Sequence, residues 1–143
     1  MDAYTIRLRD TRIVVAVHID PTTLDDVIPF IDAYTAMLTK LDDEMKSVAS
    51  PRYYVLMDVS KLTVSLLQPK VSIITALTKM FITNGPISDR VLAGAAIIVG
   101  SAAVASTINN ALQLVPDGVP THVCDSKEAA KIWLKSLREK NSD

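Results

Sequence analysis

Short apolar stretches alternate with amphipathic stretches along most of this chain, and this alternation limits its possible folds more than any other feature. Residues 53–59 and 91–99 are mostly apolar, as is typical of strands buried on both faces of a sheet. The stretches between and after them have apolar residues at steps of three and four, as helices with one buried face do. Strands that alternate with helices favour a mostly parallel sheet covered by helices.

The N-terminal residues predict an antiparallel hairpin. Residues 4–10 alternate apolar and polar side chains, which is the period of a strand with one exposed face. Residues 12–19 form a second apolar stretch directly after the pair Asp10-Thr11. We therefore expect these two strands to pair at one edge of the sheet.

The first covering helix is expected to begin at Thr22 or Thr23, either of which can cap it. Pro29 either kinks its first turns or marks its true start. The later helices are expected at about residues 69–83, 102–114 and 126–137. The fold class is thus α/β, with a mostly parallel sheet of about five strands, an antiparallel N-terminal edge hairpin and four covering helices. We expect a single domain over residues 1–143.

Two helix ends have clear signals. The turn Asn84-Gly85-Pro86 is expected to stop the second helix. Asp125, with Glu128 three residues later, is expected to cap the last helix. Four apolar residues are expected to form the buried face of that last helix, namely Ala129, Ile132, Trp133 and Leu137.

The stretch from residue 91 to residue 115 has no charged residue and is long enough to cross a bilayer, which takes about 20 residues. However, Gly100-Ser101 divides it, and polar residues become frequent after Ala105. A strand, a tight turn and a helix explain the stretch better than a membrane span, so we expect no membrane insertion.

The charge pattern gives no sign of nucleic-acid binding. The chain has 15 Lys and Arg against 16 Asp and Glu, and its basic residues are scattered singly along the sequence. Its single cysteine cannot form an intramolecular disulfide, and its N-terminus resembles no secretory signal. We therefore expect a cytoplasmic location.

Several stretches resemble a known superfamily. These are "VLMDVS" at residues 55–60, "GAAIIVG" at 94–100 and, above all, "THVCDSKEAAKIWLKSL" at 121–137. With the order of the elements, they resemble the STAS domains, the anti-sigma-factor antagonist and sulphate-transporter superfamily, and within it the SpoIIAA-like group. The resemblance extends from about Tyr4 to Leu137. It implies the same α/β fold and a regulatory role through contacts with protein partners.

In the anti-sigma-factor antagonists, a serine in an Asp-Ser pair at a helix N-terminus is phosphorylated to break binding to a partner kinase. Here Asp58 ends the strand, but no Asp-Ser pair follows it, and the nearest hydroxyls belong to Ser60, Thr63 and Ser65. Only Ser65 lies near the expected start of the next helix, so it is the one candidate for phosphorylation. Alternatively, Asp58 and these hydroxyls shape the loop by hydrogen bonding to its amides.

We place a ligand- or partner-binding site at the carboxyl edge of the sheet, where open α/β folds usually bind their ligands. The turn after the 91–99 strand lacks the glycine spacing and the lysine of a phosphate loop, so packing and helix capping explain it more simply. The candidate binding residues are Asp58, Ser60, Thr63, Ser65, Gly100 and Ser101.

Neither a metal centre nor a catalytic group is recognisable. His18, His122 and Cys124 are the only histidines and cysteine, and their spacing matches no metal motif. No nucleophile lies beside a base, and no pair of carboxylates stands in contrasting surroundings. We therefore expect no metal, no cofactor and no enzymatic activity.

Three functional classes stay open, and the first is preferred. It is a non-catalytic binding or regulatory module that acts on a protein partner or on itself. The second is a carrier of a lipid-like ligand or a nucleotide, with a pocket along residues 71–82, including Met80 and Phe81. The third is an enzyme whose site the sequence does not display. An exposed apolar patch would favour the first class, a closed apolar cavity the second, and a cleft with strongly perturbed titratable groups the third.

Overall fold

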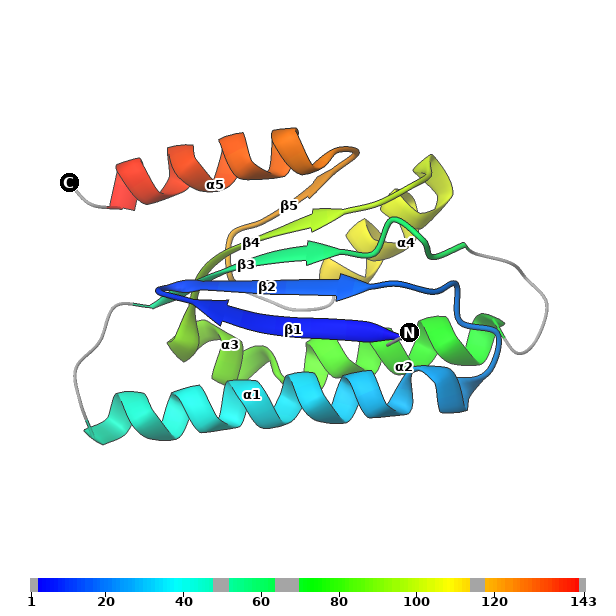
Figure 1. The fold of residues 1–143 in the computed structure, drawn as a ribbon, viewed down its shortest axis with the longest axis horizontal. Coiled ribbons are helices and arrows are strands. Elements are labelled where there is room, and N and C mark those ends of the chain that lie inside the picture. The colour runs from blue at the N-terminus through cyan, green and yellow to red at the C-terminus, as the bar shows by residue number, and fades with distance from the viewer. Residues whose placement is uncertain (1–2, 48–51, 64–69, 114–117, 142–143) are drawn as a thin grey trace.

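The computed structural model describes residues 3–47, 52–63, 70–113 and 118–141 of the chain, which form a five-stranded sheet with helices on both faces (Figure 1). The strands are β1 (Tyr4–Arg9), β2 (Arg12–Val17), β3 (Tyr53–Asp58), β4 (Leu92–Ile98) and β5 (Thr121–Cys124). The helices are η1 (Leu24–Asp26), α1 (Ile28–Ser47), α2 (Lys70–Thr83), α3 (Gly85–Val91), α4 (Ala102–Leu112) and α5 (Lys127–Asn141).

The strands lie in the order of the sequence, β1-β2-β3-β4-β5. β1 and β2 are antiparallel, and every other neighbouring pair is parallel. The predicted class, a mostly parallel sheet with an antiparallel edge hairpin, is therefore confirmed. Asp10 lies in the hairpin turn with φ 54°, in the left-handed region that aspartate tolerates better than most residues.

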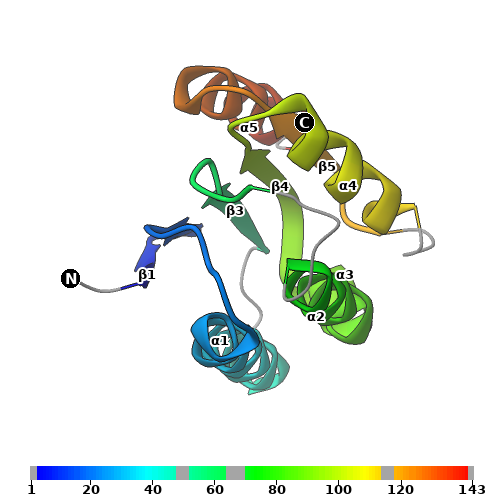
Figure 2. The same ribbon diagram turned by 90° about the vertical axis from the view of Figure 1, so that its right-hand side faces the viewer.

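The sheet has a thick helical layer on one face and a thin one on the other (Figure 2). Crossovers between parallel strands are right-handed, so crossovers that advance in one direction along a sheet place their helices on the same face. Helices α1, α2 and α4 accordingly pack over one large apolar cluster. Helix α5 follows the last strand and packs over β3, β4 and β5 on the opposite face, in a smaller cluster.

The start of the first helix confirms one alternative for Pro29, which marks the true start of the α-helix. The carboxylate of Asp26 accepts hydrogen bonds from the amides of Thr22, at 2.9 Å, and Thr23, at 3.1 Å. These bonds lower the pKa of Asp26 and fix the short 3-10 turn η1. The α-helix proper begins at Ile28, so Pro29 occupies its first turn, where its missing amide hydrogen has no cost.

The prediction of four covering helices was wrong, because the described residues form five α-helices. The turn at Asn84-Gly85-Pro86 ends α2 as expected, but it also begins the short helix α3. Pro86 is compatible with the first turn of α3. The buried side chain of Asn84 donates a hydrogen bond to the hydroxyl of Thr35 at 3.0 Å, which fixes this turn against α1.

The predicted cap and buried face of α5 were also partly wrong. The hydroxyl of Ser126, not the side chain of Asp125, accepts a hydrogen bond from the amide of Ala129 at 3.1 Å. Ala130 and Leu134 are the buried residues, and Ile132, which lies midway between them in the sequence, is 68% exposed. Residues four apart share one side of a helix, and a residue two positions from each lies on the other side.

In the parts of the chain that the structure describes, no helix has both the length and the apolarity needed to cross a membrane. Residues 91–113 of the uncharged stretch instead form the end of α3, strand β4 and helix α4. The interpretation of this stretch as strand, turn and helix is therefore confirmed for those residues.

Candidate functional site

Asp58 lies at the end of β3 and shapes the turn that follows it. Its Oδ1 accepts a hydrogen bond from the amide of Ser60 at 2.9 Å. The amide of Val59 donates to the carbonyl oxygen of Ile98 at 2.9 Å, so the loop stays paired with β4 for one more residue. This is the loop-shaping role that the sequence offered as the alternative to a switch.

Thr63 is held by a residue that the sequence did not single out. Its amide donates to Oδ1 of Asp20 at 3.0 Å, and its hydroxyl donates to Oδ2 at 2.6 Å. Asp20 follows β2, as Thr63 follows β3, so this contact joins two neighbouring loops at the carboxyl edge of the sheet. The signal that points to Asp20 is its position directly after the apolar stretch of residues 12–19.

Gly100 and Ser101 join β4 to α4. A Cβ on Gly100 would overlap the carbonyl oxygen of Ser60, so the close approach of the two loops requires glycine there. The hydroxyl of Ser101 accepts a hydrogen bond from the amide of Val104 at 3.2 Å and caps α4. Packing and capping are the roles that the sequence interpretation preferred for this pair.

The structure thus brings only part of the predicted set together. Asp58, Ser60 and Gly100 are neighbours, and Thr63 pairs with the loop after β2. Ser65 lies outside the described residues. A binding role for this loop edge stays a prediction, because the hydrogen bonds described here lie within the loops themselves.

The soft metal ligands are used in other ways. Nε2 of His18 lies 3.0 Å from the hydroxyl of Thr5, and the ring of His122 stacks on Trp133 at 5.3 Å between centroids. Burial raises the pKa of the Cys124 thiol. The described residues include no cluster of three or more His, Cys, Asp or Glu side chains that could hold a metal ion.

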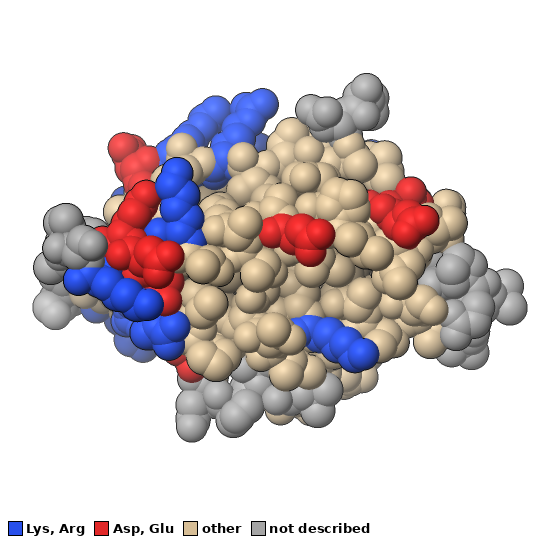
Figure 3. All heavy atoms as spheres, turned by 90° about the horizontal axis from the view of Figure 1, so that it is seen from below, with Lys and Arg blue, Asp and Glu red and all other residues tan. Residues whose placement is uncertain are grey.

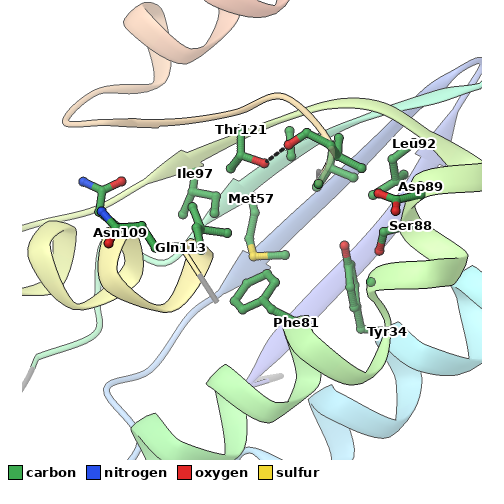
Figure 4. A pocket seen from close by; sticks show the side chains of 16 residues that line it. Tyr34, Met57, Phe81, Ser88, Asp89, Leu92, Ile97, Asn109, Gln113 and Thr121 are labelled. Carbon is green, nitrogen blue, oxygen red and sulfur yellow. Dashed lines mark hydrogen bonds between the residues drawn. The ribbon is translucent and has the colours of Figure 1, made fainter. Parts of the chain in front are cut away.

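A cavity of about 540 Å³ lies between the sheet and the helices of the thick layer (Figure 4). Phe81 lines it, as the prediction of a pocket along residues 71–82 requires, whereas Met80 lines a separate hollow of about 40 Å³. The sheet contributes Val55, Met57, Leu92, Ala95, Ile97 and Thr121. The helices contribute Tyr34, Phe81, Gly85, Ser88, Asp89, Asn109 and Leu112, and the loops contribute Gln113, Gly118 and Val119.

Small residues explain why the layer leaves this space. Val55, Ala95 and Thr121 lie side by side across β3, β4 and β5, and none of them is long. Gly85, at the junction of α2 and α3, adds no side chain opposite them. These small residues therefore leave space between the sheet and the helices, which larger side chains would have filled.

Tyr34 gives the cavity a polar group in its interior. The side chain is only 4% exposed, and Figure 4 shows its hydroxyl directed away from α1 toward the cavity. Among the described residues this hydroxyl has no hydrogen-bond partner. Every fully buried polar side-chain atom of the described residues does have one. The Tyr34 hydroxyl is therefore not fully enclosed, and it borders the open space of the cavity. Burial raises its pKa well above the ordinary value for tyrosine, so it stays a neutral donor and acceptor.

Most of the remaining polar side chains lie at the rim. Asn109 of α4 and Gln113, directly after α4, lie on one side, and Ser88 and Asp89 of α3 lie on the other (Figure 4). Thr121 on β5 donates its hydroxyl hydrogen to the carbonyl oxygen of Val119 at 2.8 Å. Asp89 is the only ionisable Asp, Glu, Lys, Arg or His among the described lining residues. The cavity therefore combines an apolar floor, one buried hydroxyl and a polar mouth.

Sequence reasoning missed Tyr34. Buried residues along α1 include Phe30, Tyr34, Leu38 and Leu41, which follow the steps of three and four that mark a core face. A tyrosine at such a position brings a hydroxyl into the core that needs a partner, and this is the signal that could have identified it. No local sequence pattern signals the cavity itself.

Comparison with known proteins supports the fold. No protein-family model and no curated protein matches this chain. An uncharacterised protein from Shewanella loihica, of the DUF3478 family with a SpoIIAA-like fold, is similar in structure, with a TM-score of 0.54 and 18% sequence identity. The match covers 94% of this chain and 95% of the other. The SpoIIAA-like fold that the resemblance implies is therefore confirmed.

Proposed function

We propose that this protein is a non-catalytic binding module whose ligand is a small, largely apolar and uncharged molecule held in the cavity beside Tyr34. The observation that supports this most directly is a buried tyrosine hydroxyl without a partner among the described residues, bordering a cavity of about 540 Å³. Ligand pockets of proteins commonly measure about 300–1,000 Å³ and combine apolar walls with a few polar groups. The cavity has this size and this composition.

The charge of the lining narrows the ligand class. No lysine or arginine is among the described lining residues, so the phosphates of a nucleotide would have no counter-ion there. Asp89 at the rim would repel an anion. Of the two ligand classes that the sequence left open, the lipid-like one is favoured over the nucleotide.

The ligand should offer Tyr34 a carbonyl, ether or hydroxyl oxygen. A buried polar group that finds its partner in a ligand contributes to affinity, because the same group without a partner is costly. The apolar floor formed by Met57, Ile97 and Phe81 would cover the rest of the molecule. The sequence preferred a module for protein contacts, and the cavity is the reason to reverse that preference.

Native mass spectrometry of gently purified protein tests this proposal. We expect an adduct of one small neutral molecule that is lost on denaturation. Tyr34→Phe should retain about tenfold less of it, because one buried hydrogen bond is removed while the ring remains.

Tyr53→Phe is the matched control, since Tyr53 packs against the same apolar cluster but does not line the cavity. Both variants should be folded like the wild type, as circular dichroism would check. Absence of any adduct from the wild type, or equal retention by Tyr34→Phe and wild type, would contradict the proposal.

A second candidate function, contact with a protein partner or with a second copy, is favoured by the outer side of the thick helical layer. Charged side chains are sparse in the middle of this face (Figure 3). The helices η1, α1 and α2 expose large apolar side chains, namely Leu24, Ile28, Val71 and Ile82. Such a patch is typical of a docking surface. In the same native spectra, a dimer or a co-purified protein in place of a small adduct would favour this candidate.

A further inference from the structure

The opposite face of the sheet is only partly covered. Helix α5 packs over β3, β4 and β5, while β1 and β2 extend beyond it (Figure 2). A groove of about 440 Å³ lies between the uncovered hairpin and α5. Its lining residues come from both ends of the chain, namely Arg7, Arg9, Asp10, Thr11, Arg12, Val14, Leu56, Lys127, Lys131 and Arg138.

The groove is strongly basic although the chain as a whole is nearly neutral. Among the described residues that line it are six of the chain's 15 Lys and Arg and a single acidic residue, Asp10. Arg7 and Arg9 alternate along β1 and therefore project from the same face of the sheet. Lys127 and Lys131 are four residues apart on α5 and so share one side of that helix. Basic side chains thus line the groove on both sides.

These cations are available to a partner. Arg7, Arg9, Lys127 and Lys131 are exposed, and no ion pair of theirs is found within the described residues. Arg138, by contrast, lies over the ring of Tyr54 at 6.0 Å. Like charges held close together repel one another, and an acidic ligand would relieve that repulsion.

The floor of the groove is apolar. Arg7 pairs with Val14 across the hairpin, and Val14 lies beside Leu56 in the parallel register. Val14 is partly exposed and does not belong to the apolar cluster beneath α5. A partner that fits both features presents acidic side chains to the walls and an apolar side chain to the floor.

We propose that this groove binds a short acidic segment of a protein partner that contains apolar residues between its Asp and Glu. A nucleic acid fits less well, because the rest of this chain has an excess of acidic residues that would repel an extended polyanion. The groove also offers no free aromatic ring for base stacking among its described lining residues. This proposal is independent of the ligand in the cavity, which lies on the other face of the sheet.

Fluorescence anisotropy with a labelled peptide of alternating Glu and Leu tests the proposal on the full chain. We expect binding that weakens as salt is added, and no binding of the matching Gln and Leu peptide. Arg7→Glu and Lys131→Glu, which change opposite walls, should each weaken binding about tenfold or more. Lys79→Glu, the same charge change at an exposed position of α2, should leave it unchanged.

Three outcomes would overturn the proposal. The first is equal binding of the Glu and Gln peptides, or no binding of either. The second is an equal loss of binding in Lys79→Glu and in the two groove variants. The third is tighter binding of single-stranded DNA or of phosphatidylserine vesicles that Arg7→Glu abolishes, which would make the groove a nucleic-acid or membrane site. Unchanged melting temperatures of the variants exclude unfolding as the cause.

Discussion

Two glycines on and after β4 stand where their neighbours leave no room for a Cβ. A Cβ on Gly94 would overlap Cδ2 of Leu137, the tip of a flexible side chain on α5. A Cβ on Gly100 would overlap the carbonyl oxygen of Ser60, which belongs to the backbone of the loop after β3. A side chain can rotate away, but a hydrogen-bonded loop cannot move without losing its bonds to Asp58 and β4.

We therefore expect Gly100→Ala to destabilise the protein by about 1–3 kcal/mol, as overpacking against a rigid neighbour does. Gly94→Ala, the matched control with the same change in backbone entropy, should cost less. Urea unfolding of both variants measures the two changes in the free energy of unfolding. A larger loss in Gly94→Ala than in Gly100→Ala would show that the two loops do not pack as described.

Among the elements, the short helix α3 is joined to α1 by an ion pair. The guanidinium of Arg90 donates to both carboxylate oxygens of Asp42, each at 3.0 Å, and the Asp42 side chain is only 9% exposed. The Arg90 hydrogen bonds hold the pKa of Asp42 below its ordinary value. Because Ser88 and Asp89 of α3 line the cavity, this pair joins one wall of the cavity to α1.

The lowered pKa gives a prediction for pH dependence. In the unfolded chain Asp42 binds its proton at a higher pH than in the folded protein, so its stabilising contribution is present above about pH 4 and is lost as the pH falls further. Asp42→Asn should therefore unfold more readily than wild type at neutral pH, and the difference should shrink in acid. Thermal melts at a series of pH values measure this.

Asp43→Asn is the control, since Asp43 is exposed and, among the described residues, forms an ion pair with Lys46 alone, at 3.6 Å. It should have little effect on stability at any pH. A difference between Asp42→Asn and wild type that persisted in acid would mean that the pair with Arg90 is not its cause.

For the molecule as a whole, the two faces of the sheet differ in how completely they are filled. Ala95 and Ala96 are successive residues of β4 and point to opposite faces. Ala95 borders the cavity of about 540 Å³, whereas Ala96 is fully buried in the small cluster beneath α5. The same substitution at these two positions should therefore have opposite effects.

Ala95→Leu should raise the free energy of unfolding by about 0.5–2 kcal/mol, because it fills space beside an apolar floor. Ala96→Leu should lower it by about 1–3 kcal/mol, because the layer under α5 has no room for it. Denaturant unfolding of both variants checks the signs. A loss of stability in Ala95→Leu similar to that in Ala96→Leu would mean that the cavity closes in solution.

Much of the fold could be predicted from local patterns. The alternation at residues 4–10 gave the hairpin, the apolar stretches gave the parallel strands, and residues such as Ser101 revealed their caps. Errors arose where two local signals competed. Gly85-Pro86 signals both the end of one helix and the start of another, and Ile132 is an apolar residue on a side of α5 that is exposed in the described part of the chain.

The sequence by itself determined the order of the strands and of the four longer helices, and that each of these helices buries one apolar face, because periods of two and of three to four residues are local properties of the chain. Only the tertiary structure decided where the layers fail to meet. The cavity joins Tyr34 to Ala95 and Thr121, and the groove joins Arg7 to Lys131. Periodicity shows that a helix covers a face of the sheet. How closely that helix packs, and which strands extend beyond it, depends on side chains far apart in the sequence.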